Sequence, residues 1–169
     1  MHRQMLRSLL PVTVLALAAP VSASPCEVAC RCVSPAALGQ SLAEFVRARR
    51  DRAERVVVGT VIRLDTLARV AWGSGHDAVA LRPIVAHVSV RRVWRGSLAD
   101  TMTVMVTTVE SRSSCDLEMR PGESYLIFAS RTEGGPLATR QCSGTVEERA
   151  APDAFEVLGS GQAARPRET

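Results

Sequence analysis

The chain of 169 residues contains neither lysine nor asparagine, so all 21 of its basic side chains are arginines. The absence of asparagine excludes an N-x-[ST] glycosylation acceptor. Aromatic residues make up only 4% of the chain, and the arginines are scattered along it. A protein with so few stacking side chains and no basic cluster is not expected to bind nucleic acid. No apolar run approaches the roughly 20 residues of a membrane-spanning helix.

The composition is otherwise typical of one globular domain. Hydrophobic residues make up 46% of the chain, which argues against disorder. The 21 basic and 17 acidic side chains give a net charge of +4. A bias toward Arg, Ala and Val is also what a G/C-rich coding sequence produces, so this charge does not by itself indicate an anionic partner.

The first residues have the pattern of a secretory signal peptide. Arg3 and Arg7 precede the apolar residues 9–19, and the small residues 21–23 form a cleavage site. We therefore expect residues 1–23 to be removed and the protein to be secreted or periplasmic. Cleavage after Ala23 removes two arginines, so 19 arginines against 17 acidic residues leave a net charge of +2.

Export places the five cysteines in an oxidising compartment, where disulfides are favoured over metal binding or catalysis. An odd number leaves at least one cysteine unpaired within the chain. Five choices of the unpaired cysteine and three pairings of the other four leave fifteen arrangements open. Two of them are separated by a single residue, so we expect each to join a distant partner. The pair is Cys30 and Cys32, and the distant partners are Cys115 and Cys142.

Helical spacing of apolar residues predicts one helix over residues 35–53. Ser34 and Pro35 form a helix start, and Leu38, Leu42 and Phe45 follow on one face. The opposite face is basic, and we interpret it as a solvated face rather than an anion-binding strip. Its arginines are Arg47, Arg49, Arg50 and Arg52.

Five β-strands are predicted after this helix, with a bulge or bend at Gly59. A loop is expected over residues 65–82, a short helix over 146–158 and a disordered tail over 159–169. This order favours a mainly β fold, a small closed five-stranded barrel with an N-terminal helix and a short C-terminal helix. The strands are expected at residues 56–64, 84–94, 101–107, 125–128 and 136–141.

Motifs for catalysis or cofactors are not convincing. Residues 73–78 match G-x-G-x-x-[GA] by letters, but a strand is expected after them where a dinucleotide site needs a helix. His76 and His87 are the histidines left after signal removal, and neither lies near a visible nucleophile and orienting acid. A thiolate metal cluster of Cys26, Cys30 and Cys32 is disfavoured in an oxidising compartment. We therefore expect a protein that is not an enzyme and has no cofactor.

Three segments together resemble a known module. Cys30-Arg31-Cys32 precedes the helix and the first strand, residues 113–116 (SSCD) precede the strand at 123–129 (ESYLIFA), and residues 137–143 (LATRQCS) end the barrel. This arrangement is similar to the netrin-type (NTR) module of the tissue inhibitors of metalloproteinases (TIMPs), and in particular to its bacterial exported relatives. The resemblance extends from Cys30 to about Glu148. It implies an OB-fold domain within residues 24–158, with Cys30 joined to Cys115 and Cys32 to Cys142, leaving Cys26 as the odd thiol.

The resemblance also implies a metalloprotease inhibitor. In the family, the α-amino group and carbonyl oxygen of the first cysteine chelate the protease zinc, and the next residues fill the substrate cleft. By position, Cys30 would be the ligand to the partner's zinc. The inhibitory ridge would consist of Cys30, Arg31, Cys32, Val33 and Ser34, flanked by Ser113 and Ser114.

One departure from the family pattern supports an alternative. Cleavage after Ala23 leaves residues 24–29 in front of Cys30, whose nitrogen is then an amide without a lone pair for zinc. The alternative is a non-inhibitory extracellular or envelope interaction module that uses the barrel face or the loop at residues 65–82. The expected partner is thus a zinc metalloprotease or another extracellular protein, and we expect a monomer with no nucleic-acid partner and no membrane span.

Overall fold

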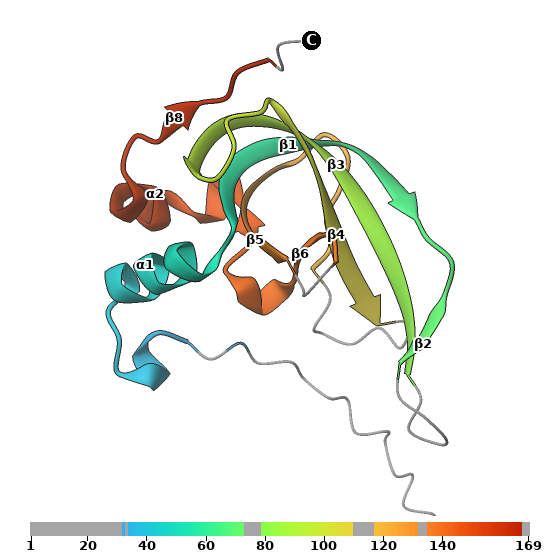
Figure 1. The fold of residues 1–169 in the computed structure, drawn as a ribbon. Helices are drawn as coiled ribbons and strands as arrows, with labels where there is room; N and C mark the ends of the chain where they lie inside the picture. The colour runs from blue at the N-terminus through green and yellow to red at the C-terminus, as the bar shows by residue number, and fades with distance from the viewer. Residues whose placement is uncertain (1–31, 33, 73–78, 110–116, 132–134, 167–169) are drawn as a thin grey trace, which may run out of the picture.

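A computed structural model describes Cys32 and residues 34–72, 79–109, 117–131 and 135–166. The fold is mainly β, with two α-helices on one side of the strands (Figure 1). Among the described residues, no helix has the length and apolar character needed to cross a membrane. The signal-peptide prediction at residues 1–23 lies outside the described residues.

Five strands form a ring. Each pairs with two others in the order β1-β3-β4-β6-β5, and β5 pairs back with β1. All of these pairings are antiparallel except that between β4 and β6, which is parallel. The strands are β1 (Arg55–Thr66), β3 (Val79–Arg95), β4 (Thr101–Val109), β5 (Ser124–Arg131) and β6 (Leu137–Thr139).

The predicted ring strands are present, but the segments beside them differ from expectation. The loop prediction for residues 65–82 is wrong at both ends, because β1 continues to Thr66 and β3 begins at Val79. Between them β2 (Val70–Trp72) pairs with β3, so the two long strands extend beyond the ring as a ribbon (Figure 1). The period-2 pattern is interrupted near residues 61–63, where the β1–β3 register shifts, and this irregularity concealed the continuation.

The single helix predicted over residues 35–53 is two elements. A 3-10 turn, η1 (Ala36–Leu38), ends at Gly39, whose φ of 65° is left-handed and stops the helix. The helix α1 (Leu42–Arg52) then begins at Ser41 with a reciprocal capping box, in which the Ser41 hydroxyl accepts from the Glu44 amide and the Glu44 carboxylate accepts from the Ser41 amide.

The C-terminal part is also more divided than expected. Instead of one helix over residues 146–158, β7 (Val146–Glu147) pairs with β5, a 3-10 turn η4 (Glu148–Ala150) follows, and α2 (Pro152–Leu158) begins at a proline. Proline favours the first helical position, which explains the late start. The prediction of a disordered tail over residues 159–169 is wrong as far as residue 166, because β8 (Gln162–Ala163) pairs with β3.

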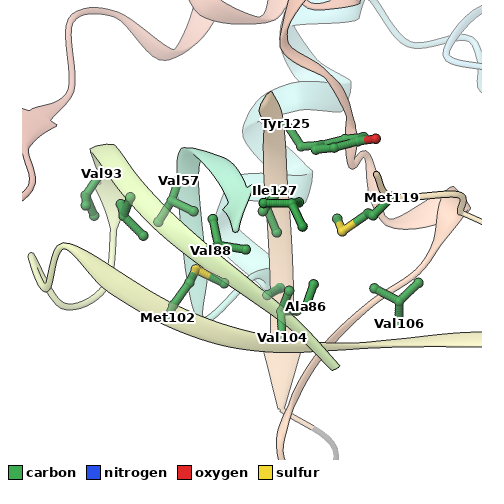
Figure 2. Packing of buried hydrophobic residues seen from close by; sticks show 13 residues of the cluster. Val57, Ala86, Val88, Val93, Met102, Val104, Val106, Met119, Tyr125 and Ile127 are labelled. Carbon is green, nitrogen blue, oxygen red and sulfur yellow. The ribbon is translucent and has the colours of Figure 1, made fainter. Parts of the chain in front are cut away.

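Two apolar clusters are packed against opposite faces of the same strands. The inner cluster lies inside the ring, where side chains from β1, β3, β4 and β5 point toward one another (Figure 2). The outer cluster lies between the helices and the outer faces of β1 and β5. The inner cluster includes Val57, Val88, Val104, Tyr125 and Ile127, and the outer one includes Val46, Val56, Leu126, Phe128 and Ala151.

Gly59 lies where β1 crosses β3, and the predicted bulge is confirmed by a register shift between Val58 and Gly59. A Cβ atom at this glycine would lie 2.5 Å from the Ser89 carbonyl oxygen and 2.6 Å from Val88 Cγ1. The close strand approach therefore depends on the missing side chain.

Candidate functional site

The predicted ridge is described only in part. Cys32 forms a disulfide with Cys142, with 5.2 Å between the two Cα atoms, and this agrees with one of the two pairings that the resemblance implies. Ser34 is exposed, and its hydroxyl accepts a hydrogen bond of 3.2 Å from the Ala37 amide at the start of η1. The other predicted ridge residues and the Cys30–Cys115 pairing lie outside the described residues. These residues are Cys30, Arg31, Val33, Ser113 and Ser114.

A buried hydroxyl cluster supports the chain on both sides of Cys142. Thr139 ends β6, and Thr145 follows the 3-10 turn η3 (Gln141–Ser143) that carries the cysteine. The Thr145 hydroxyl accepts from the Phe128 amide at 2.9 Å, and the Thr139 hydroxyl donates to the Phe128 carbonyl at 3.0 Å. The two threonine oxygens are 2.6 Å apart, and both side chains are buried.

This hydroxyl cluster fixes the position of the turn to which the disulfide joins Cys32 of the predicted ridge. The backbone of Phe128 is in the middle of β5, so its hydrogen bonds to Thr139 and Thr145 tie the turn at Cys142 to the ring. Ser143 continues the network, because its hydroxyl lies 2.9 Å from that of Thr139 and donates to the Arg140 carbonyl at 2.6 Å. A buried network with its donors and acceptors paired is rigid, so Cys32 is held by a rigid turn.

An apolar groove opens between α1 and α2, close to the turn that carries Cys142. It encloses about 230 Å³, and Phe128 and Gly144 form part of its wall. Leu42 and Val146 also line it, with 42% and 37% of their surface exposed. Arg49, which the sequence placed on a solvated face, also lines it and lies over the Phe45 ring at 4.9 Å. The groove could accept an apolar side chain.

A polar contact that the sequence did not reveal lies on the outer face of β1 and β3. His87 Nε2 is 2.7 Å from Asp65 Oδ2, and Arg63 Nη2 donates to the same carboxylate oxygen at 2.9 Å. The hydrogen bond with His87, opposed by partial desolvation and assisted by the charge of Arg63, lowers the pKa of Asp65 below its ordinary value. All three side chains are at least partly exposed.

The contacts among Arg63, Asp65 and His87 could not be foreseen from the sequence. Asp65 was expected in a loop, so only the β1–β3 register, which places Arg63 opposite His87, reveals these contacts. Within the described part of the chain, no group of three His, Cys, Asp or Glu side chains is arranged to hold a metal ion. His76 lies in the segment 73–78, which is outside the described residues. The strand β3 follows this segment directly, as expected from the sequence, whereas a dinucleotide site would need a helix there.

Tyr125 joins the start of β5 to the segment that precedes it. Its hydroxyl accepts from the Arg120 amide at 3.0 Å and donates to the Glu118 carbonyl at 3.3 Å. Burial raises the pKa of this phenol, so the hydroxyl remains a hydrogen-bond donor at neutral pH. It thereby fixes the described end of the connection between β4 and β5, which also carries the predicted flanking ridge.

No protein-family model matches the sequence, and no curated protein matches it either.

Proposed function

We propose that this protein is an exported OB-fold domain of the netrin and TIMP type that inhibits a zinc endopeptidase through the ridge at residues 30–34. An OB-fold is a five-stranded Greek-key barrel. The ring of five strands, with its non-sequential order and its single parallel pairing, supports that assignment.

The observation that carries the proposal is the Cys32–Cys142 disulfide. An inhibitor that resists its protease needs a binding segment held in one conformation, because ordering a flexible segment lowers affinity. Here the ridge is joined covalently to a turn that the buried Thr139 and Thr145 hydroxyls tie to β5. Disulfides also form and persist in the compartments to which the predicted signal peptide would direct the chain.

The chemistry of inhibition depends on where the mature chain begins. A free α-amino group at Cys30 has a lone pair for zinc, and with the carbonyl oxygen of the same residue it could displace the catalytic water. If residues 24–29 remain, that nitrogen is an amide and does not coordinate zinc. Inhibition by chelation therefore requires a chain that begins at Cys30.

Two forms of the protein test this. The first begins at Ser24 and the second at Cys30, and both are titrated against a panel of zinc endopeptidases at micromolar concentration. Chelation predicts inhibition by the form that begins at Cys30, and loss of that inhibition when one alanine is added before the cysteine. N-terminal sequencing of the exported protein shows which form exists. If neither form affects any protease, the inhibitory proposal is wrong.

The second candidate function is a non-inhibitory interaction module. It is favoured by Leu67 and Val70, which lie in the segment 65–82 and are 45% and 48% exposed. Contiguous exposed apolar surface marks interaction sites, so these two side chains make the segment a candidate. Crosslinking of the protein in a secretome, with a Leu67→Ser/Val70→Ser variant as control, tests this function. A captured protein that the variant captures equally well counts against this surface.

A further inference from the structure

Within the part of the chain that the structure describes, β1 has an open edge where it leaves the ring. Residues 56–60 of β1 pair with β5 on one side and with β3 on the other. Residue 62 is skipped where the register shifts, and from residue 63 to residue 66 β1 pairs with β3 alone. No described strand covers the other side of these residues. The last described contacts on that side are the two hydrogen bonds between Val61 and the turn at Gly122 and Glu123.

The direction of the free backbone groups follows from the register. The Leu67 amide donates to the Pro83 carbonyl at 2.9 Å, so residue 67 faces β3. Hydrogen-bonded residues alternate along an antiparallel ladder, and the pairing of Arg63 with His87 and of Asp65 with Val85 keeps the same register. Residues 63 and 65 therefore bond to β3, and residues 64 and 66 direct their amide and carbonyl groups outward.

The charges on this edge are complementary to those on the same edge of a second copy. If a second copy pairs antiparallel with Leu64 opposite Leu64, each Arg63 lies opposite the Asp65 of the other copy. The two contacts are equivalent by the two-fold symmetry. They occupy non-hydrogen-bonded positions, where side chains on neighbouring strands are closest. Within one chain Arg63 pairs with its own Asp65, and both side chains are exposed, at 63% and 43%, so each could exchange this partner for the one on the other copy.

Exposed apolar residues lie along the same margin. Of the six large apolar side chains that are exposed in the described part of the chain, three belong to β1, β2 and their connection. Of the other three, Leu42 and Val146 line the groove beside α1, and Leu38 lies in η1. The three residues at the edge are Ile62, Leu67 and Val70, with 60%, 45% and 48% of their surface exposed. In this pairing Ile62 of each copy lies opposite Thr66 of the other, so the exposed Ile62 side chains of both copies would lie at the interface.

We propose that the protein forms a symmetric dimer in which residues 62–66 of β1 pair antiparallel with the same residues of a second copy. Charged residues on a strand edge usually discourage pairing with other chains. On this edge the arginine and the aspartate, two residues apart, disfavour pairing with most other strands. With a second copy of the same edge they form two opposite-charge pairs. The proposal revises the monomer expected from the sequence, and it holds whether or not the protein inhibits a protease.

Charge reversal tests the pairing. In Arg63→Asp or Asp65→Arg each symmetric contact becomes a like-charge pair, whereas Arg63→Asp/Asp65→Arg restores opposite charges at both. We expect sedimentation equilibrium to show a micromolar dimer. Each single reversal should raise its dissociation constant by about tenfold or more, and the double reversal should return it to within about threefold. Arg95→Asp, an exposed change of equal charge outside the edge, should leave the constant unchanged.

A backbone variant tests the edge independently of charge. Thr66→Pro removes an outward amide at an exposed position and should abolish the dimer, with circular dichroism showing that the monomer remains folded. Free thiols are alkylated beforehand so that Cys26 cannot link two chains. A protein that remains monomeric up to millimolar concentration overturns the proposal. So does a dimer that is unaffected by the single reversals and by Thr66→Pro, or one that the double reversal fails to restore while it stays folded.

Discussion

The two sides of the ring are buried differently. Strands β1 and β5 contact the inner cluster with one face and the helices with the other, and residues 125–129 are buried consecutively. Strand β4 contacts the inner cluster with one face only, so Met102 and Val104 are buried while Thr101 and Thr103 are exposed. A continuous apolar run thus marks a strand covered on both faces, and alternation marks a strand covered on one.

The largest expected effect compares neighbouring residues of β5. Ile127→Ala removes a side chain from the inner cluster and Phe128→Ala removes one from the outer cluster, so both should create cavities. We expect the free energy of unfolding to fall by about 2–5 kcal/mol for the first and about 3–5 kcal/mol for the second. Urea denaturation measures both.

The matched change on the other side of the ring is Thr103→Ala in β4, whose side chain is exposed. It should alter the free energy of unfolding by no more than about 0.5 kcal/mol. If Phe128→Ala cost as little as Thr103→Ala, the helices would not bury β5, and the difference between the two sides would disappear.

The next effect concerns the disulfide between Cys32 and Cys142. Cys32→Ser/Cys142→Ser removes a disulfide between residues 110 positions apart, which restores freedom to the unfolded chain. We expect a loss of about 2–4 kcal/mol in the free energy of unfolding. Adding a reducing agent to the wild type should lower its stability at least as much, and no further loss from this bond should occur in the variant. A variant as stable as the wild type would contradict the anchoring role.

A smaller effect is expected where the two sides meet. Gly59→Ala places a Cβ atom against the Ser89 carbonyl oxygen, and a backbone oxygen cannot move as a flexible side chain can. We expect a loss of about 1–3 kcal/mol from overpacking. Thermal denaturation monitored by circular dichroism measures it. A neutral result would show that β1 and β3 separate easily at this crossing.

The smallest effect lies on the exposed side. The pKa of Asp65 is lowered chiefly by its hydrogen bond with His87, so this contact stabilises the folded state above the unfolded value of about 3.9. That stabilisation is lost as the pH falls through the lowered pKa. Asp65→Asn should therefore be less stable than the wild type at neutral pH, and the difference should shrink near pH 3. A difference that stays constant between these pH values would contradict the ion-pair interpretation.

The strands were predictable because their patterns are local. β-branched residues and turn signals located all five ring strands, and Gly59 correctly indicated a bulge. The break between η1 and α1 was missed because apolar spacing continues across Gly39, although the glycine and the Ser41–Glu44 capping box were visible signals. Helical periodicity outweighed them.

The site was less predictable, because its contacts join distant parts of the chain. Asp65 and His87 meet only through the β1–β3 register, which the irregular pairing near residues 61–63 shifts. Spacing left the cysteine pairings open, and only the resemblance singled out Cys32 with Cys142. The hydroxyls of Thr139 and Thr145 are ordinary in the sequence and are identified by their burial beside Phe128.

The parallel pairing of β4 with β6 has a consequence for folding kinetics. Only Met105 with Ala138 and Val106 with Thr139 are paired there, and each pair is separated by more than thirty residues along the chain. The hairpins form from neighbouring segments, whereas this pairing and that of β1 with β5, whose partners are even farther apart in sequence, must wait for loop closure over a long distance. The ring is therefore expected to close late in folding, and in the native state amide protons near this short seam should exchange before those of β1 and β3.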